Sequence, residues 1–167
     1  GGAVYLRLST RPLNQPQREL SPELRTQIVA GGYWLRPPGS GAELAVVVSG
    51  PVVAEAVDAY NQIIEDLPNA GLLVVTSADR LQQNWIASVR AGQGDRAHVV
   101  RLLEPLASTA GLVTVLDGHP ATLSWLGSVG QHRVQPLGVG EFGQSGDIPD
   151  LYHAYGLDAT AIMDAAA

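Results

Sequence analysis

One stretch, residues 111–146, most constrains what this chain can fold into, because it predicts a complete strand–helix–strand crossover. Residues 112–116 form a short apolar, β-branched run, typical of a strand buried on both faces of a parallel sheet. Pro120 then stands where a first helical turn tolerates a missing N–H, and we expect a helix to about Val129. Residues 134–139 return as the next strand. Because parallel strands need such a crossover, the chain is predicted to be an α/β protein.

Three further segments are predicted as strands. Residues 44–48 and 72–75 are apolar runs bounded by turn residues. Residues 28–36 predict an edge strand, with a bulge or bend at Gly31-Gly32 and an end at Pro37. The connection from this edge strand to residues 44–48 is too short for a crossover, so we expect these two strands to be antiparallel neighbours.

The helices are predicted from apolar residues that repeat with the helical period. Residues 53–67 carry such a stripe throughout. Ser77 or Asp79 can cap the next helix, which should bury Leu81, Trp85 and Val89, and a short helix should follow over residues 99–106.

The end of the chain predicts two more helices. Asp147 and Pro149 open a helix that should bury Ile148 and end at Gly156 in the left-handed conformation, and Asp158 caps the last one. The sum is a three-layer α/β/α fold with about five strands, mostly parallel with one antiparallel edge strand. We divide the chain into residues 1–27, a strand (3–8) and an extended connector with one helical turn after Ser21, and residues 28–167, the α/β domain.

Composition excludes several classes of function. The ten basic residues are all arginine, so Schiff-base chemistry and a P-loop lysine are excluded, and the absence of cysteine excludes disulfides and thiolate ligands. A net charge of −6 opposes nucleic-acid binding, and no apolar run approaches the length of a membrane span. The charge is uneven: residues 1–36 hold five arginines and two acids. This basic arm either lies against the acidic body of its own chain or docks on further chain or a partner.

The strand ending in Asp117-Gly118-His119-Pro120, the crossover after it, Phe142-Gly143-x-Ser145 and the closing LYHAYGLDATAI together resemble a known family. They are similar to the C-terminal domain of the transketolase family, above all to the homodimeric type of pyruvate dehydrogenase first component, a thiamine diphosphate enzyme. Residues 5–10 and 76–79 fit the same resemblance, which covers nearly the whole chain.

The resemblance implies a cytoplasmic parent enzyme that decarboxylates pyruvate and acetylates the lipoyl group of an acyltransferase subunit. This domain would contact the other domains and the homodimer mate as a supporting wall, and would be inactive alone. The family's cofactor fingerprint is Gly-Asp-Gly followed by Asn, and Asp117-Gly118 is preceded here by Leu116. We therefore expect no catalytic, cofactor-binding or metal residue in this chain, and thiamine diphosphate with Mg²⁺ elsewhere in the parent.

Asp117 and His119 are the most enzyme-like residues. A strand-end Asp beside a His could form an acid–base pair, which would make the chain a small α/β enzyme. The favoured interpretation is that one of them caps the helix opened by Pro120. Neither His132 nor His153 stands at a metal-ligand spacing from His119.

Residues 138–146 form a glycine-rich loop that superficially resembles a phosphate-binding loop, although it follows the last strand of its crossover rather than the first. We favour a rigid turn in which Phe142 packs and Ser145 caps. The alternative function is a free-standing regulatory or small-anion-binding domain that uses a crevice near Ser77, Asp117 and Glu141.

The large aromatic residues complete the candidates. Trp85 fits a buried helical stripe and is predicted to belong to the core. Trp34, beside Tyr33 on the predicted edge strand, either belongs to the core or anchors an interface, where aromatic residues dominate.

Overall fold

The computed structural model describes residues 3, 12–14 and 16–167, and within them five strands form one sheet. The strands are β1 (Gly32–Arg36), β2 (Ala42–Ser49), β3 (Gly71–Val75), β4 (Leu106–Leu116) and β5 (Arg133–Leu137). The α-helices are α1 (Pro22–Ala30), α2 (Val53–Asp66), α3 (Ala78–Arg90), α4 (His98–Leu103), α5 (Ala121–Ser124), α6 (Gly127–Gly130), α7 (Ile148–Ala154) and α8 (Ala159–Ala166). Most of the strand predicted over residues 3–8 lies outside the described residues. None of the described helices is long and apolar enough to span a bilayer.

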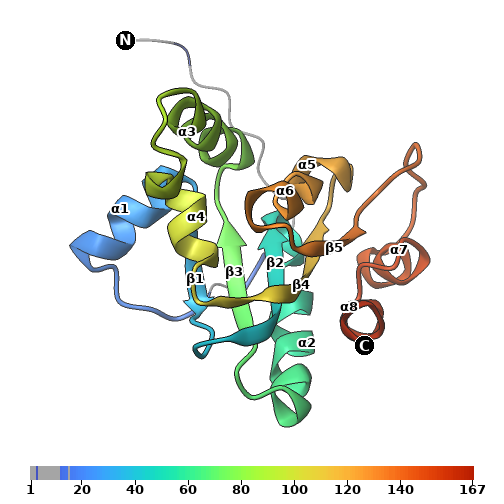
Figure 1. Cartoon of the computed structure of the whole chain (residues 1–167). Helices are drawn as coiled ribbons and strands as arrows, with labels where there is room; N and C mark the ends of the chain where they lie inside the picture. The colour runs from blue at the N-terminus through green and yellow to red at the C-terminus, as the bar shows by residue number, and fades with distance from the viewer. Residues whose placement is uncertain (1–2, 4–11, 15) are drawn as a thin grey trace.

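The strand order is β1-β3-β2-β4-β5, with β2 at the centre (Figure 1). β2 runs parallel to both β3 and β4, β5 runs parallel to β4, and β1 is antiparallel to β3. The predicted mostly parallel sheet with one antiparallel edge strand is confirmed. The predicted partner of that edge strand was wrong: β1 pairs with β3, and not with β2. Pro136 stands inside β5, the opposite edge, where it pairs with Thr114.

Helices cover both faces of the sheet, which gives the predicted three layers. Successive residues of the central strand alternate between two cores: Val46 and Val48 pack with α2 and α8, whereas Ala45 and Val47 pack on the other face. That second core also takes buried residues from α3, α4 and α5: Leu81, Val99, Leu102, Leu103 and Leu123. Both faces of β2 are therefore buried, as a continuous apolar strand requires.

The segment before β1 is helical for longer than predicted. Ser21 caps α1, accepting a hydrogen bond from the backbone N–H of Leu24, and the helix runs on through Ala30. Gly31 ends it with φ +114, so this glycine is a helix C-cap and not a strand bulge. The strand expected from Ile28 begins only at Gly32. The proposed division at residue 27 falls inside α1.

The crossover after β4 is also irregular where one helix was predicted. Two short helices, α5 and α6, replace it, and the turns between them are closed by tight bonds such as Leu126 N–H to Leu123 O (3.1 Å). A side chain at Gly127 would come within 2.7 Å of Val134 on β5, so the backbone lies directly against the strand there. β4 itself begins earlier than predicted, and Leu106 belongs to it instead of to α4.

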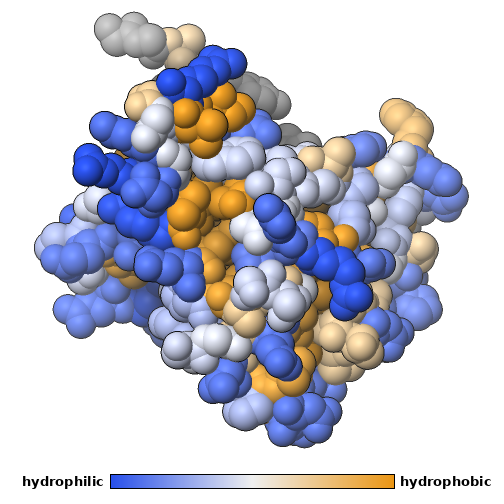
Figure 2. All heavy atoms as spheres, in the orientation of Figure 1, coloured by the Kyte–Doolittle hydropathy of each residue, from blue (hydrophilic) through white to orange (hydrophobic). Residues whose placement is uncertain are grey.

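The stripe predicted for α3 is only partly buried. Leu81 is fully buried and Trp85 is half-buried, but Val89 is 53% exposed, which corrects its assignment to the core. Figure 2 shows apolar surface over α3, where Ile86 is also exposed. On α7, Ile148 is exposed as well, although it was expected to be buried.

Candidate functional site at the carboxyl ends of the strands

The carboxyl ends of the parallel strands bring the sequence-predicted residues to one edge of the sheet. Ser49 at the end of β2 pairs with Leu116 at the end of β4, so Asp117 comes beside Gly50. Gly50 has φ +81, and a Cβ built on it would lie 2.7 Å from Asp117 Oδ1. The glycine therefore supplies both a left-handed turn and the space that the carboxylate occupies.

The end of β3 is tied to α1 by hydrogen bonds. Ser77 Oγ accepts from the backbone N–H of Arg80, so of the two predicted candidates Ser77, and not Asp79, caps α3. The Thr76 hydroxyl donates to Ile28 O at 2.6 Å, and the backbone N–H groups of Thr76 and Ser77 both donate to Gly31 O. These polar groups are therefore used in joining elements of the fold.

His119 lies in the turn that follows Asp117. Its Nδ1 accepts a hydrogen bond from the backbone N–H of Ala121 at 3.2 Å, so the ring satisfies a donor in the first turn of α5. The same turn is held to the end of β5, because Val139 N–H donates to Gly118 O at 2.9 Å. The geometry is that of a helix start, with the imidazole exposed to solvent.

The glycine-rich loop between β5 and α7 stands away from the sheet (Figure 1). Glu141, Phe142 and Ser145 are all exposed, and the Phe142 side chain is completely so. The prediction that Phe142 packs was wrong, since the loop turns outward before α7. One tie to the body is the hydrogen bond from Gln144 N–H to Tyr155 Oη at 3.2 Å.

Tyr33 and Trp34 point to opposite faces of β1. Tyr33 is 3% exposed and packs in the core beside α2, with the Arg18 guanidinium carbon 5.2 Å from its ring centroid. Burial raises the pKa of Tyr33 above its ordinary value, and the Arg18 charge acts in the opposite direction. Trp34 is half-buried, and its Nε1–H donates to Leu102 O at 2.9 Å. Only Trp34 of this pair offers side-chain surface.

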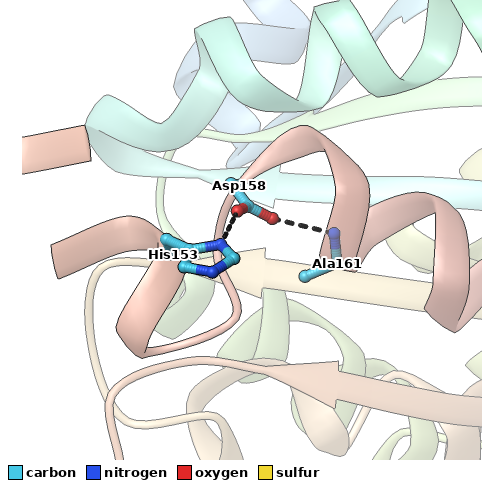
Figure 3. Close-up of polar contacts among 3 residues, drawn as sticks. All are labelled: His153, Asp158 and Ala161. Atoms are coloured by element: carbon cyan, nitrogen blue, oxygen red, sulfur yellow. Dashed lines mark hydrogen bonds and ion pairs between the residues drawn. The ribbon is translucent and has the colours of Figure 1, made fainter. Parts of the chain in front are cut away.

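One polar pair was not predicted (Figure 3). Asp158 caps α8 as expected, accepting from the backbone N–H of Ala161 at 2.8 Å, and its second oxygen lies 2.8 Å from His153 Nδ1. The Ala161 bond and then the His153 contact lower the pKa of Asp158. Only the turn at Gly156, which has φ +63, brings the two side chains together, so helical spacing could not have shown the contact.

The residues at this edge do not fit a diphosphate–Mg²⁺ group. Mg²⁺ prefers several oxygen ligands in octahedral geometry, and in the described chain the carboxylate that directly follows the end of β4 is that of Asp117 alone. The Asp117 carboxylate also opposes a small anion at this point. Among the described residues no group of three His, Asp or Glu side chains could hold a metal ion.

Comparison with known proteins finds similar folds among solved structures. No protein-family model matches the chain, and no curated protein matches it significantly. Solved structures do match. Transketolase from Campylobacter jejuni subsp. jejuni NCTC 11168 is 18% identical with a TM-score of 0.57, covering 91% of this chain and 20% of that one. Transketolase from Leishmania mexicana is 17% identical with a TM-score of 0.59, covering 84% and 18%.

A third match is described as "Split gene transketolase, inactive beta4 tetramer", where beta4 names that assembly and not a strand. It is 19% identical with a TM-score of 0.57, covering 93% of this chain and 44% of that one. At these identities the likeness establishes the fold: the chain is a transketolase-like α/β domain, as its motifs predicted. It spans about a fifth of the two whole transketolase chains.

Proposed function

We propose that this chain is the C-terminal supporting domain of a thiamine diphosphate-dependent enzyme. The observation that carries the proposal is the transketolase-like fold, which corresponds to only 20% of the Campylobacter transketolase chain. A domain of this size and fold is a part of such an enzyme, and the parent's remaining domains are its first partners.

The side chains at the strand ends support a structural role. Ser77 and His119 hold helix starts, and the Ser49 hydroxyl donates to Val75 O at 2.9 Å. The predicted acid–base pair would need Asp117 to orient His119, and His119 Nδ1 instead accepts the backbone N–H of Ala121. The match to a split-gene transketolase described as inactive also supports a domain that has no activity by itself.

More specifically, we propose that the parent enzyme is the first component of a pyruvate dehydrogenase complex. It is supported by the sequence Gly140-Glu141-Phe142-Gly143-Gln144-Ser145-Gly146, which resembles that type of enzyme. The parent would then form a homodimer and transfer acetyl groups to the lipoyl group of an acyltransferase subunit. The exposed Phe142 loop is available for a contact with the rest of that assembly.

The test is to place an affinity tag on the C-terminus of the chain in its native gene and to purify the product under native conditions. We expect a larger protein that carries thiamine diphosphate and Mg²⁺. Pyruvate-dependent reduction of an artificial electron acceptor would support the dehydrogenase proposal, and ketol transfer between sugar phosphates would instead assign the parent to transketolase proper. A captured protein without thiamine diphosphate and without either activity would contradict the proposal.

A further inference from the structure

A groove of about 860 Å³ lies between α1, α3 and α4, beside the β1 edge of the sheet. Val29 and Arg80 of its lining adjoin the contacts that tie α1 to the end of β3. The apolar lining of the groove includes Val29, Trp34 and Leu102, and its polar lining includes Arg80, His98 and Arg101. The three helices surround β1 on the left of Figure 1. Val29 on α1 is 61% exposed, so α1 presents an apolar side chain to the groove rather than to a packed core.

Several polar groups of the groove are fixed by hydrogen bonds to backbone atoms. Arg80 Nη1 donates to Val29 O at 3.1 Å, so the guanidinium is held against the end of α1. His98 Nε2 lies 2.8 Å from Gly32 O, and because a carbonyl only accepts, Nε2 carries the proton. Asn84 Oδ1 accepts from the backbone N–H of His98 at 2.9 Å. Arg80, Asn84 and His98 are therefore positioned before any ligand arrives, which lowers the entropic cost of binding.

The charge of the groove differs in sign from that of the whole chain. Arg80 and Arg101 carry permanent positive charges, against one lining acid, Glu23, while the chain as a whole has a net charge of −6. Hydrogen bonds to its own backbone N–H and to the Ser21 side chain lower the pKa of Glu23, so it is ionised at neutral pH. Guanidinium groups bind carboxylates and phosphates through paired, charge-assisted hydrogen bonds.

We propose that this groove binds a small amphiphilic anion, with a carboxylate or phosphate head at Arg80 and Arg101 and an apolar body against Val29, Trp34 and Leu102. The volume is in the range of small-molecule sites, which combine mostly apolar walls with a few placed polar groups. The proposal rests on the lining residues alone, so its test does not depend on the function proposed for the parent enzyme.

The test is a fluorescence titration of the 167-residue chain with 8-anilinonaphthalene-1-sulfonate, an anionic aromatic probe. We expect saturable binding at one site that Arg101→Gln weakens by about tenfold and Arg101→Lys by less, because lysine keeps the charge but not the planar fork. Val29→Ser should weaken binding by removing an apolar wall without changing charge. Glu23→Gln should strengthen it about twofold to threefold, because an opposing charge is removed.

Matched controls come from arginines outside the lining. Arg90→Gln on α3 and Arg96→Gln just before α4 make the same change of charge. The affinity of these variants for the probe should stay within about twofold of that of the unsubstituted chain. Circular dichroism and urea midpoints would verify that each variant is folded.

Competition defines the ligand class. Octanoate or octyl phosphate should displace the probe, and the stronger of the two names the head group, whereas octanol should be at least about tenfold weaker. Equal competition by octanol, or unchanged binding in Arg101→Gln, would overturn the proposal. Displacement by a glutamate- and leucine-rich peptide but by neither octyl anion would also overturn it, in favour of a protein partner.

Discussion

The indole rings of Trp85 on α3 and Trp125 after α5 stack with their centroids 5.7 Å apart and their planes 22° from parallel. Both rings are half-buried and pack against the second core. The pair therefore joins a helix near the middle of the chain to the irregular crossover that follows β4.

Trp85→Ala should lower the free energy of unfolding by about 2 kcal/mol, less than for a fully buried tryptophan, because part of the ring is in water. Urea denaturation measures the change. Trp85→Phe should lose less, because an aromatic ring can still stack on Trp125. In a double-mutant cycle with Trp125→Ala, a coupling energy of about 1 kcal/mol is expected, and strict additivity would show that the stacked contact contributes nothing of its own.

Gly50 and Gly41 offer a matched pair of substitutions. Both have positive φ, +81 and +72, but a Cβ at Gly50 would meet Asp117 Oδ1 at 2.7 Å whereas nothing lies within 4 Å at Gly41. Gly41→Ala should cost about 1–2 kcal/mol for the left-handed backbone alone, and Gly50→Ala about 1 kcal/mol more. Thermal unfolding of both variants tests this. If adding Asp117→Ala to Gly50→Ala restores none of the excess, the close contact is not its cause.

The capping carboxylate of Asp158 predicts that the free energy of unfolding depends on pH. Its folded-state pKa lies below the ordinary value of 3.8, so the ionised group stabilises the fold above that pH, and the stabilisation is lost as the pH falls through the folded pKa. Asn caps a helix as well as Asp does, so Asp158→Asn isolates the charge. At pH 7 this variant should be less stable by about 0.5 kcal/mol.

Urea unfolding from pH 7 to pH 3 measures the difference in the free energy of unfolding between the unsubstituted chain and Asp158→Asn. We expect this difference to shrink as the pH falls. His153→Ala is the control for the second contact. The His153 side chain is 85% exposed, so its loss should have little effect. A difference that is as large at pH 3 as at pH 7 would mean that the charge is not responsible.

Thr114 is fully buried in β4, and its hydroxyl has no hydrogen-bond partner among the residues that the structure describes. Thr114→Val, which keeps the shape, should therefore stabilise the chain by about 1 kcal/mol. The reverse change next to it, Val113→Thr, should destabilise by about 1–2 kcal/mol, because Val113 is 1% exposed and packs in the opposite core. A lower melting temperature for Thr114→Val would reveal a bound water at the hydroxyl.

The strands of the parallel core could be predicted from sequence because both of their faces are buried. Val46 to Val48 must all be apolar, so the pattern is local and continuous. The length of α1 could not be predicted, because none of its residues is fully buried and its apolar pattern is weak. The partner of β1 depends on contacts far apart in sequence, which no local pattern records.

The candidate site was predictable only in its capping residues. Ser77 and Asp158 cap helices because a polar residue immediately before a helical pattern has a local meaning. The prediction that Phe142 packs was wrong because a hydrophobic side chain by itself predicts burial, whereas the loop that carries Phe142 extends into solvent. The groove between α1 and α4 was missed because its lining runs from Glu23 to Pro105 and is assembled only by the fold.

The proline inside β5 has a consequence for how copies of this chain can meet. β5 is an edge strand of only five residues, and Pro136 at its fourth position has no N–H to donate to an incoming strand. Extension of the sheet across this edge, the usual route to domain swapping and fibrils, is therefore disfavoured. Contacts on this side of the molecule must be made by side chains of helices and loops, which confines stable association to partners with a complementary shape.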